Sequence, residues 1–187
     1  MIPNGDLSAE DNDILSEEDT NLYGLTARLH GARLLAQEAH AGQVDKSGKP
    51  YFLHVETVSR TVADLIRDQE LGSEMFSLKA QIVGYLHDII EDTDITPEDL
   101  RGYAIPPDCI LAIEAITKND GLSYQDYLVR VRSNKLATVV KIADMMHNSD
   151  LSRLDYVTIK DLTRREKYQK AIMFLYDTSE QKGDSNP

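Results

Sequence analysis

The stretch His87-Asp88-Ile89-Ile90-Glu91-Asp92-Thr93 decides how this chain is interpreted. Imidazole and carboxylate groups are ligands of divalent metals, and here one of each directly precedes two more carboxylates. A second imidazole lies upstream at His54, and a further carboxylate lies downstream at Asp144. The sequence therefore predicts one divalent metal site with a carboxylate pair beside it for proton transfer. The predicted ligands are His54, His87, Asp88 and Asp144, and the predicted catalytic pair is Glu91 and Asp92.

The spacing within this stretch limits how one helix can present it. Neighbouring residues on a helix diverge by about 100°, so consecutive side chains of one helix cannot all reach the same ion. Residues four apart stack on one surface, about 6 Å apart along the axis. A helix end could aim His87 and Asp88 at an ion and leave Glu91 and Asp92 beside a substrate.

The rest of the chain predicts an all-α fold with a single domain. Apolar residues recur at three- and four-residue steps, with no alternating strand pattern and no internal repeat. Thr96-Pro97 and Ser123 with Asp126 are typical of helix starts. The expected helices cover about 22–42, 53–67, 78–90, a segment from 96, a segment after 107, 123–131, 135–148 and 159–176.

Composition excludes several classes of protein. The 187 residues fit one domain with tails, expected as a flexible acidic tail over 1–20, a body over 21–178 and a polar tail over 179–187. The formal net charge is -12, which gives no basic face for duplex nucleic acid. No apolar run approaches the ~18 residues that span a bilayer, and no signal peptide is apparent. The single cysteine, Cys109, agrees with a cytoplasmic location.

The ligand types narrow the metal. Nitrogen and oxygen ligands without a thiolate favour Mn²⁺, Fe²⁺, Co²⁺ or Zn²⁺ in an open site over a structural zinc cage. Such an ion lowers the pKa of bound water and stabilises charge that develops on phosphorus. The sequence therefore predicts a metal-dependent hydrolase.

Three blocks of sequence carry a family resemblance over roughly residues 30–155. The first is His40-Ala-Gly-Gln43 followed by Lys46-Ser-Gly-Lys-Pro-Tyr51 and His54. The second is Leu86-His-Asp-Ile-Ile-Glu-Asp-Thr93, and the third is Lys141-Ile-Ala-Asp-Met-Met-His-Asn148. In this order they resemble the hydrolase domain of the Rel/SpoT stringent-response enzymes, which are HD-domain metal phosphohydrolases.

The resemblance implies an HD-type helical bundle, a single Mn²⁺ ion, and hydrolysis of the 3′-pyrophosphate of (p)ppGpp to GDP or GTP plus pyrophosphate. By position it implies the same four ligands, and it gives Glu91 and Asp92 the roles of activating water or supplying a proton. It also places Lys46, Ser47 and Asn148 against the nucleotide. The length leaves no room for the synthetase domain of the long bifunctional enzymes, which points to a small stand-alone hydrolase.

The chain departs from the family where cations are usual. Asp45 stands where the family has an arginine that stacks on guanine, and Met145 stands where it favours another arginine. Asp150 replaces a basic residue, and Val55 replaces a proline at the helix start. These changes leave the metal chemistry intact and bear on the identity of the substrate.

Two alternatives therefore stay open beside (p)ppGpp hydrolysis. One is an HD phosphohydrolase that acts on another nucleotide phosphate. The other is a catalytically inactive HD protein that senses a nucleotide. Lys46, Lys49 and Lys141 are candidates for phosphate contacts or for a solvated surface, and His147 is a candidate for a hydrogen bond behind a ligand. The oligomeric state is not predicted.

Overall fold

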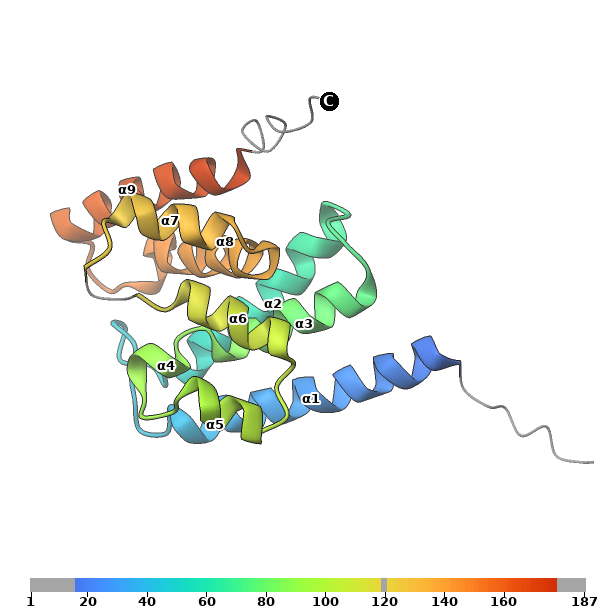
Figure 1. Ribbon diagram of the computed structural model, residues 1–187. Helices are drawn as coiled ribbons and strands as arrows, with labels where there is room; N and C mark the ends of the chain where they lie inside the picture. Colours follow the sequence, from blue (N-terminus) through green and yellow to red (C-terminus); the bar gives the residue numbers. More distant parts are fainter. Residues whose placement is uncertain (1–15, 119–120, 178–187) are drawn as a thin grey trace, which may run out of the picture.

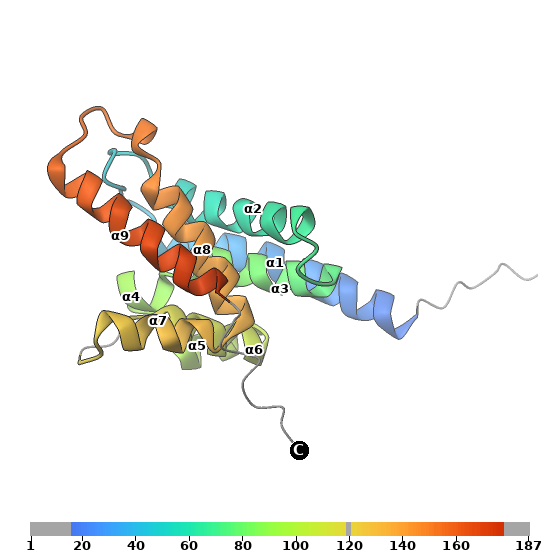
Figure 2. The ribbon, with the colours of Figure 1, turned by 90° about the horizontal axis from the view of Figure 1, so that it is seen from above.

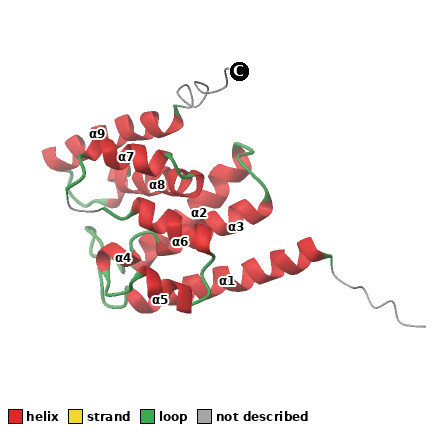
Figure 3. Ribbon diagram, viewed as in Figure 1, coloured by secondary structure: helices red, strands yellow, loops and turns green. Residues whose placement is uncertain are grey.

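Every regular element of the computed structural model is a helix over the residues that it describes, 16–118 and 121–177 (Figures 1 and 3). The predicted all-α class is confirmed. A single isolated bridge joins Val44 and Pro50 within this part of the chain. The helices are α1 (Glu17–Ala39), α2 (Phe52–Asp68), α3 (Glu74–Leu86), α4 (Ile89–Asp92), α5 (Pro97–Gly102), α6 (Pro107–Ile116), α7 (Tyr124–Arg132), α8 (Lys135–Ser149), the 3-10 helix η1 (Leu151–Arg153) and α9 (Ile159–Tyr176).

Helix α3 is the centre of the bundle. The residues from Ile82 to Leu86 face different directions around the helix, yet all of them are buried. A helix that is apolar all round must be covered on all sides, and α3 packs against α1, α2, α6 and α8. In Figure 1, α1 and α9 lie on opposite sides of this centre. The C-terminal end of α3 therefore brings His87 into the interior.

Helices α2 and α3 approach each other closely at a glycine. A Cβ atom at Gly84 would lie 2.8 Å from the Cα of Ser59, so only glycine fits this contact. Helix α2 is amphipathic, and Val55, Val58 and Val62 lie on its buried face. His54 shares that face, so the close crossing brings it towards the end of α3.

Several helices begin where the sequence predicted. Thr96 caps α5 in a reciprocal capping box with Asp99, and Pro97 occupies the first turn. The Ser123 hydroxyl accepts a hydrogen bond from the Asp126 amide at the start of α7. Asn134 caps α8 in the same way.

Several boundaries differ from the sequence prediction, and one of them is the end of α3, which was expected near residue 90 and lies at Leu86. Helix α1 begins at Glu17, inside the segment predicted as a tail, where an acidic side chain is favourable at the positive end of the helix dipole. Residues 1–15 and 178–187, which hold the rest of the predicted tails, lie outside the described residues. Helix α3 begins at Glu74, one turn earlier than expected, because Ser73 caps it.

No helix in the described part of the chain has the length and apolarity to cross a membrane.

Candidate metal centre and active site

A break between two helices presents His87 and Asp88. Helix α3 ends at Leu86, and the backbone of Asp88 leaves the helical region at φ -103° and ψ 0° before α4 begins. The helix does not continue through this stretch, so the two side chains project from a corner. This is the arrangement that a shared ion requires, because one straight helix would turn them apart.

The predicted ligands come together from three elements that are distant in sequence. His54 from α2, with His87 and Asp88 from the corner, offer ligand atoms that all lie within 4.8 Å of one another. Asp144 on α8 completes the set from the other side, since its Oδ1 lies 3.4 Å from His54 Nε2 and 3.8 Å from His87 Nε2. All four side chains are at most 15% exposed.

The hydrogen bond of His87 shows that this group fits a metal. Its Nδ1 lies 2.8 Å from the Gly84 carbonyl oxygen, which only accepts, so Nδ1 carries a proton and Nε2 is the nitrogen whose lone pair a metal can take by displacing a proton. His87 Nε2 is buried and has no hydrogen-bond partner, although Asp88 Oδ2 lies 2.9 Å away. An unpartnered buried nitrogen is costly in a folded protein, and a cation is the partner that this lone pair and the two carboxylates suit.

The charges in the cluster are strongly coupled. Burial would raise the pKa of Asp88 and of Asp144, but neighbouring cationic groups outweigh it and hold both pKa values well below the usual range. His87 and His54 lower the pKa of Asp88, and Lys141 makes the largest contribution to lowering the pKa of Asp144. Burial opposes protonation of His87, yet the two carboxylates raise its pKa to about 10. The carboxylates are therefore ionised and ready to receive a cation.

Two further side chains hold the carboxylates in place. The Tyr51 hydroxyl donates a 2.6 Å hydrogen bond to Asp88 Oδ2, and burial with the charge of Asp88 raises the Tyr51 pKa, so it stays a donor. Lys141 Nζ lies 2.7 Å from Asp144 Oδ2. Lys141 is only 7% exposed, so the structure makes it a buried counterion and not a phosphate contact at the surface.

The predicted catalytic pair lies on the short helix α4. The Glu91 carboxylate accepts hydrogen bonds from Lys118 Nζ at 3.0 Å and from the Lys118 amide at 3.3 Å. Asp92 is exposed overall, yet partial desolvation of its carboxyl group together with the charge of Asp88 raises its pKa. Gln43 donates to the Asp92 carbonyl oxygen at 2.9 Å and so ties α4 to the loop before α2.

A cavity of about 210 Å³ adjoins the metal ligands, since His54 is one of its walls. All three residues predicted to bind substrate line it, namely Lys46, Ser47 and Asn148. The sequence analysis missed two arginines in the same wall, Arg153 and Arg164, because both lie beyond the three sequence blocks and only the tertiary fold brings them here. The remaining walls are Val44, Asp45, Tyr51, Asp150 and Leu154.

The departures from the family have distinct structural outcomes. Asp45 lines the cavity, but its carboxylate forms an ion pair with Arg153 and is neutralised there. Asp150 also lines the cavity, and its carboxylate accepts from the Ser152 amide and hydroxyl at 2.9 and 2.6 Å. Met145 is 1% exposed in the core, so it leaves the site without a cation at that position.

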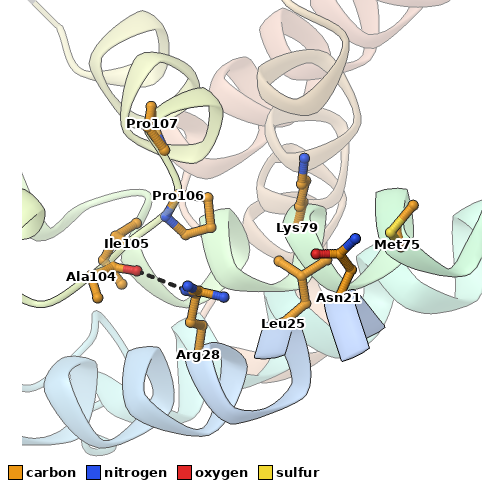
Figure 4. Close-up of a pocket in the computed structure, with 9 residues that line it drawn as sticks. All are labelled: Asn21, Leu25, Arg28, Met75, Lys79, Ala104, Ile105, Pro106 and Pro107. Atoms are coloured by element: carbon orange, nitrogen blue, oxygen red, sulfur yellow. Dashed lines mark hydrogen bonds between the residues drawn. The ribbon is translucent and has the colours of Figure 1, made fainter. Parts of the chain in front are cut away.

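A larger cavity of about 520 Å³ lies between α1, α3 and the segment that joins α5 to α6 (Figure 4). Arg28 lines it, with Nε donating to the Ala104 carbonyl oxygen at 3.1 Å. Lys79 also lines it and pairs with Asp108 at 2.7 Å. None of the predicted site residues borders this cavity, and no carboxylate or imidazole lines it.

The sequence is similar to those of several characterised bacterial enzymes. The chain is 30% identical to the bifunctional (p)ppGpp synthase/hydrolase SpoT of Escherichia coli over 135 residues, which cover 65% of this chain. It is 34% identical over 98 residues, or 52% of this chain, to guanosine-3′,5′-bis(diphosphate) 3′-pyrophosphohydrolase of Vibrio cholerae. It is 30% identical over 170 residues, or 84% of this chain, to GTP pyrophosphokinase of Streptomyces coelicolor. The chain is related to the Rel/SpoT enzymes.

The Rel/SpoT resemblance predicted from the three sequence blocks is thus confirmed. The matched segments cover 17%, 12% and 18% of these relatives, so the chain spans less than a fifth of their length. The structure also resembles that of a metazoan orthologue of SpoT that is described as hydrolysing ppGpp. That likeness has a TM-score of 0.61 at 21% identity and covers 80% of this chain and 85% of the other, which supports the Rel/SpoT-type fold. No family model matches the chain.

Proposed function

We propose that this protein is a metal-dependent hydrolase that removes the 3′-pyrophosphate from (p)ppGpp. The observation that carries the proposal is the buried, unpartnered Nε2 of His87, which lies near Asp88 and Asp144. The neighbouring cavity has Lys46, Arg153 and Arg164 in its wall. The names of the Rel/SpoT relatives support the choice of substrate.

His54, His87, Asp88 and Asp144 would hold the metal, and Mn²⁺ is the ion that we propose. A divalent ion bound there supplies a Lewis acid that stabilises charge on phosphorus and lowers the pKa of water. The chain would hold the nucleotide through Lys46, Ser47 and Asn148, which line the cavity next to His54. Burial of the ligands keeps bulk water from competing for them.

The proposed proton transfers use the two carboxylates on α4. Hydrolysis breaks the bond between the 3′-oxygen and phosphorus, so water must lose a proton and the 3′-oxygen must gain one. Asp92 suits the role of acid because its raised pKa lets it carry a proton nearer to neutral pH. Glu91 suits the role of orienting water, and Lys118 holds its carboxylate in place.

Turnover of ppGpp by the purified protein in Mn²⁺ tests this proposal. We expect release of pyrophosphate, and we expect Asp88→Ala to lose at least about 100-fold in turnover, since even residues behind metal ligands cost 10- to 100-fold. Asp64→Ala is the matched control, because Asp64 is an exposed carboxylate on α2 that pairs with Arg67. Equal turnover by wild type and Asp88→Ala would contradict the proposal.

A second candidate function is hydrolysis of another nucleotide phosphate at the same site. Asp45 and Asp150 in the cavity wall favour it, since they stand where cations would meet a highly phosphorylated guanosine. A panel of guanosine and adenosine 3′- and 2′-phosphates would decide, and turnover without preference for guanosine would favour this candidate. Binding of ppGpp without turnover would instead favour a nucleotide sensor. A cytoplasmic location stays a prediction.

A further inference from the structure

A chain of polar contacts runs from the cavity wall to one of the metal ligands. Arg153 forms an ion pair with Asp45 through Nη2. Its Nη1 lies 3.0 Å from the His147 carbonyl oxygen and 3.2 Å from His147 Nδ1. His147 Nδ1 in turn lies 2.7 Å from His54 Nδ1. The two outer contacts, His54 with His147 and Asp45 with Arg153, join residues 93 and 108 positions apart, so they hold separate parts of the fold together. In Figures 1 and 2 the loop before α2 and the segment after α8 lie at the same end of the bundle.

The direction of the hydrogen bonds follows from the arginine. A guanidinium group has only donors, so His147 Nδ1 must accept from Arg153. A nitrogen that accepts cannot also carry a proton, so the proton between the two histidines belongs to His54 Nδ1. The lone pair of His54 therefore lies on Nε2, which faces Asp88 at 3.5 Å and Asp144 at 3.4 Å.

The anchor of Arg153 is itself held by the loop. One oxygen of Asp45 accepts from the Ser47 amide at 2.8 Å, from the Ser47 hydroxyl at 2.7 Å and from the Lys49 amide at 3.0 Å. The other oxygen of Asp45 is left for Arg153. The Asp45 side chain is only 11% exposed and that of Arg153 22%, so solvent competes little for this pair.

We propose that Arg153 is a positioning residue for the metal centre, which fixes the ring of His54 through His147 and is itself held by Asp45. The inference rests on the proposed function, because it presumes that His54 binds the metal. The proposal explains why an aspartate stands at position 45. Its carboxylate forms an ion pair with Arg153, which the arginine usual in the family could not form because it has the same charge. The pair would thus couple the loop that lines the substrate cavity to the metal ligand.

The tautomer of His54 in the metal-free protein, at a pH at which the ring is neutral, tests the proposal directly, and nitrogen-15 NMR of the ring measures it. We expect wild type to show a proton on Nδ1, and Arg153→Met to show a mixture of tautomers. Mn²⁺ affinity of Arg153→Met, measured by calorimetry without nucleotide, should fall about tenfold, as for other residues that orient metal ligands. Arg153→Lys keeps a donor towards His147 and should recover part of the affinity.

Arg67→Met is the matched control, because Arg67 also pairs with aspartates but on the outer surface of α2. Asp45→Asn is the milder variant if Arg153→Met does not fold, and its Mn²⁺ affinity should fall by a smaller factor. Unchanged His54 tautomer and Mn²⁺ affinity in a folded Arg153 variant would overturn the proposal, even if ppGpp turnover fell. A protein that shows the expected tautomer shift but never turns over ppGpp would support this inference and contradict the proposed function.

Discussion

His87 and His54 face the same two carboxylates, yet different parts of the molecule hold them. The Nδ1 of His87 donates to a carbonyl oxygen three residues earlier in its own chain segment, at Gly84. The Nδ1 of His54 contacts His147, which in turn contacts Arg153. His147 lies in the last turn of α8 and Arg153 in η1. One ring is fixed by local backbone, and the other by tertiary contacts.

Because the supports differ, substitutions that disturb His87 and substitutions that disturb His54 should have different effects. The support of His87 is part of the core, so damage to it should appear as lost stability. The support of His54 lies at a cavity wall, so damage to it should appear as altered metal binding in a folded protein. The predictions below separate these outcomes.

The largest effect should come from Lys141, which supports both histidines because it holds Asp144 between them. Lys141→Met leaves the buried Asp144 carboxylate without its counterion, which should destabilise the metal-free protein by about 3–5 kcal/mol. Mn²⁺ should restore part of the loss, since the ion also neutralises Asp144. Urea unfolding with and without Mn²⁺ measures both values, and equal losses in the two conditions would contradict the explanation.

A smaller effect should follow when the local support of His87 is disturbed. Gly84→Ala would force α2 and α3 apart, because the new Cβ would lie 2.8 Å from Ser59 Cα, and overpacking of this kind costs about 1–3 kcal/mol. Thermal unfolding would reveal it. Gly31→Ala on α1 is the matched control, since nothing lies within 4 Å of its Cβ position, and it should leave stability unchanged or raise it by about 0.4–1 kcal/mol.

Tyr51→Phe removes a single hydrogen bond to Asp88 and keeps the ring. We expect Mn²⁺ affinity to fall about tenfold while the unfolding transition stays nearly in place, since Tyr51 orients a ligand from behind. Calorimetric titration would measure the change. A variant that bound Mn²⁺ as tightly as wild type would show that the corner alone positions Asp88.

The smallest effect on the site should come from a helix cap remote from both histidines. Thr96→Ala removes the capping box of α5 and should cost about 1 kcal/mol of stability. Mn²⁺ affinity should not change, because no contact of α5 reaches the ligand cluster among the interactions described above. A loss of metal affinity here would mean that stability and metal binding are not separable in this fold.

The same division explains what the sequence could reveal. The sequence analysis extended the helix to about residue 90, whereas α3 ends at Leu86. Only the limit on how one straight helix can present His87 and Asp88 to an ion was available from local geometry. The caps at Thr96 and Ser123 were also local and were predicted. The sequence contains one indication that Lys141 pairs with Asp144. Lys141 lies three residues before this predicted ligand on the same helix, a spacing that places the two side chains next to each other.

The contacts of Arg153 had no such signal. Nothing in the order of residues indicates that a short turn after α8 meets a loop more than a hundred positions earlier. For the same reason, Asp45 appeared from the sequence as the loss of a cation, whereas the structure supplies a cation to the same wall from another segment.

The loop from Gln43 to Tyr51 is closed by its own backbone, with the Asp45 amide donating to Lys49 at 2.8 Å and the Tyr51 amide to Gln43 at 2.9 Å. Gly48, at φ +77°, makes the tight reversal that this closure needs. The exposed Lys46 can therefore be substituted without a change in the helices. Asp45 is constrained, because its carboxylate accepts hydrogen bonds from the loop. Preference for new nucleotides could drift at the tip while the hydrolytic centre stays as it is.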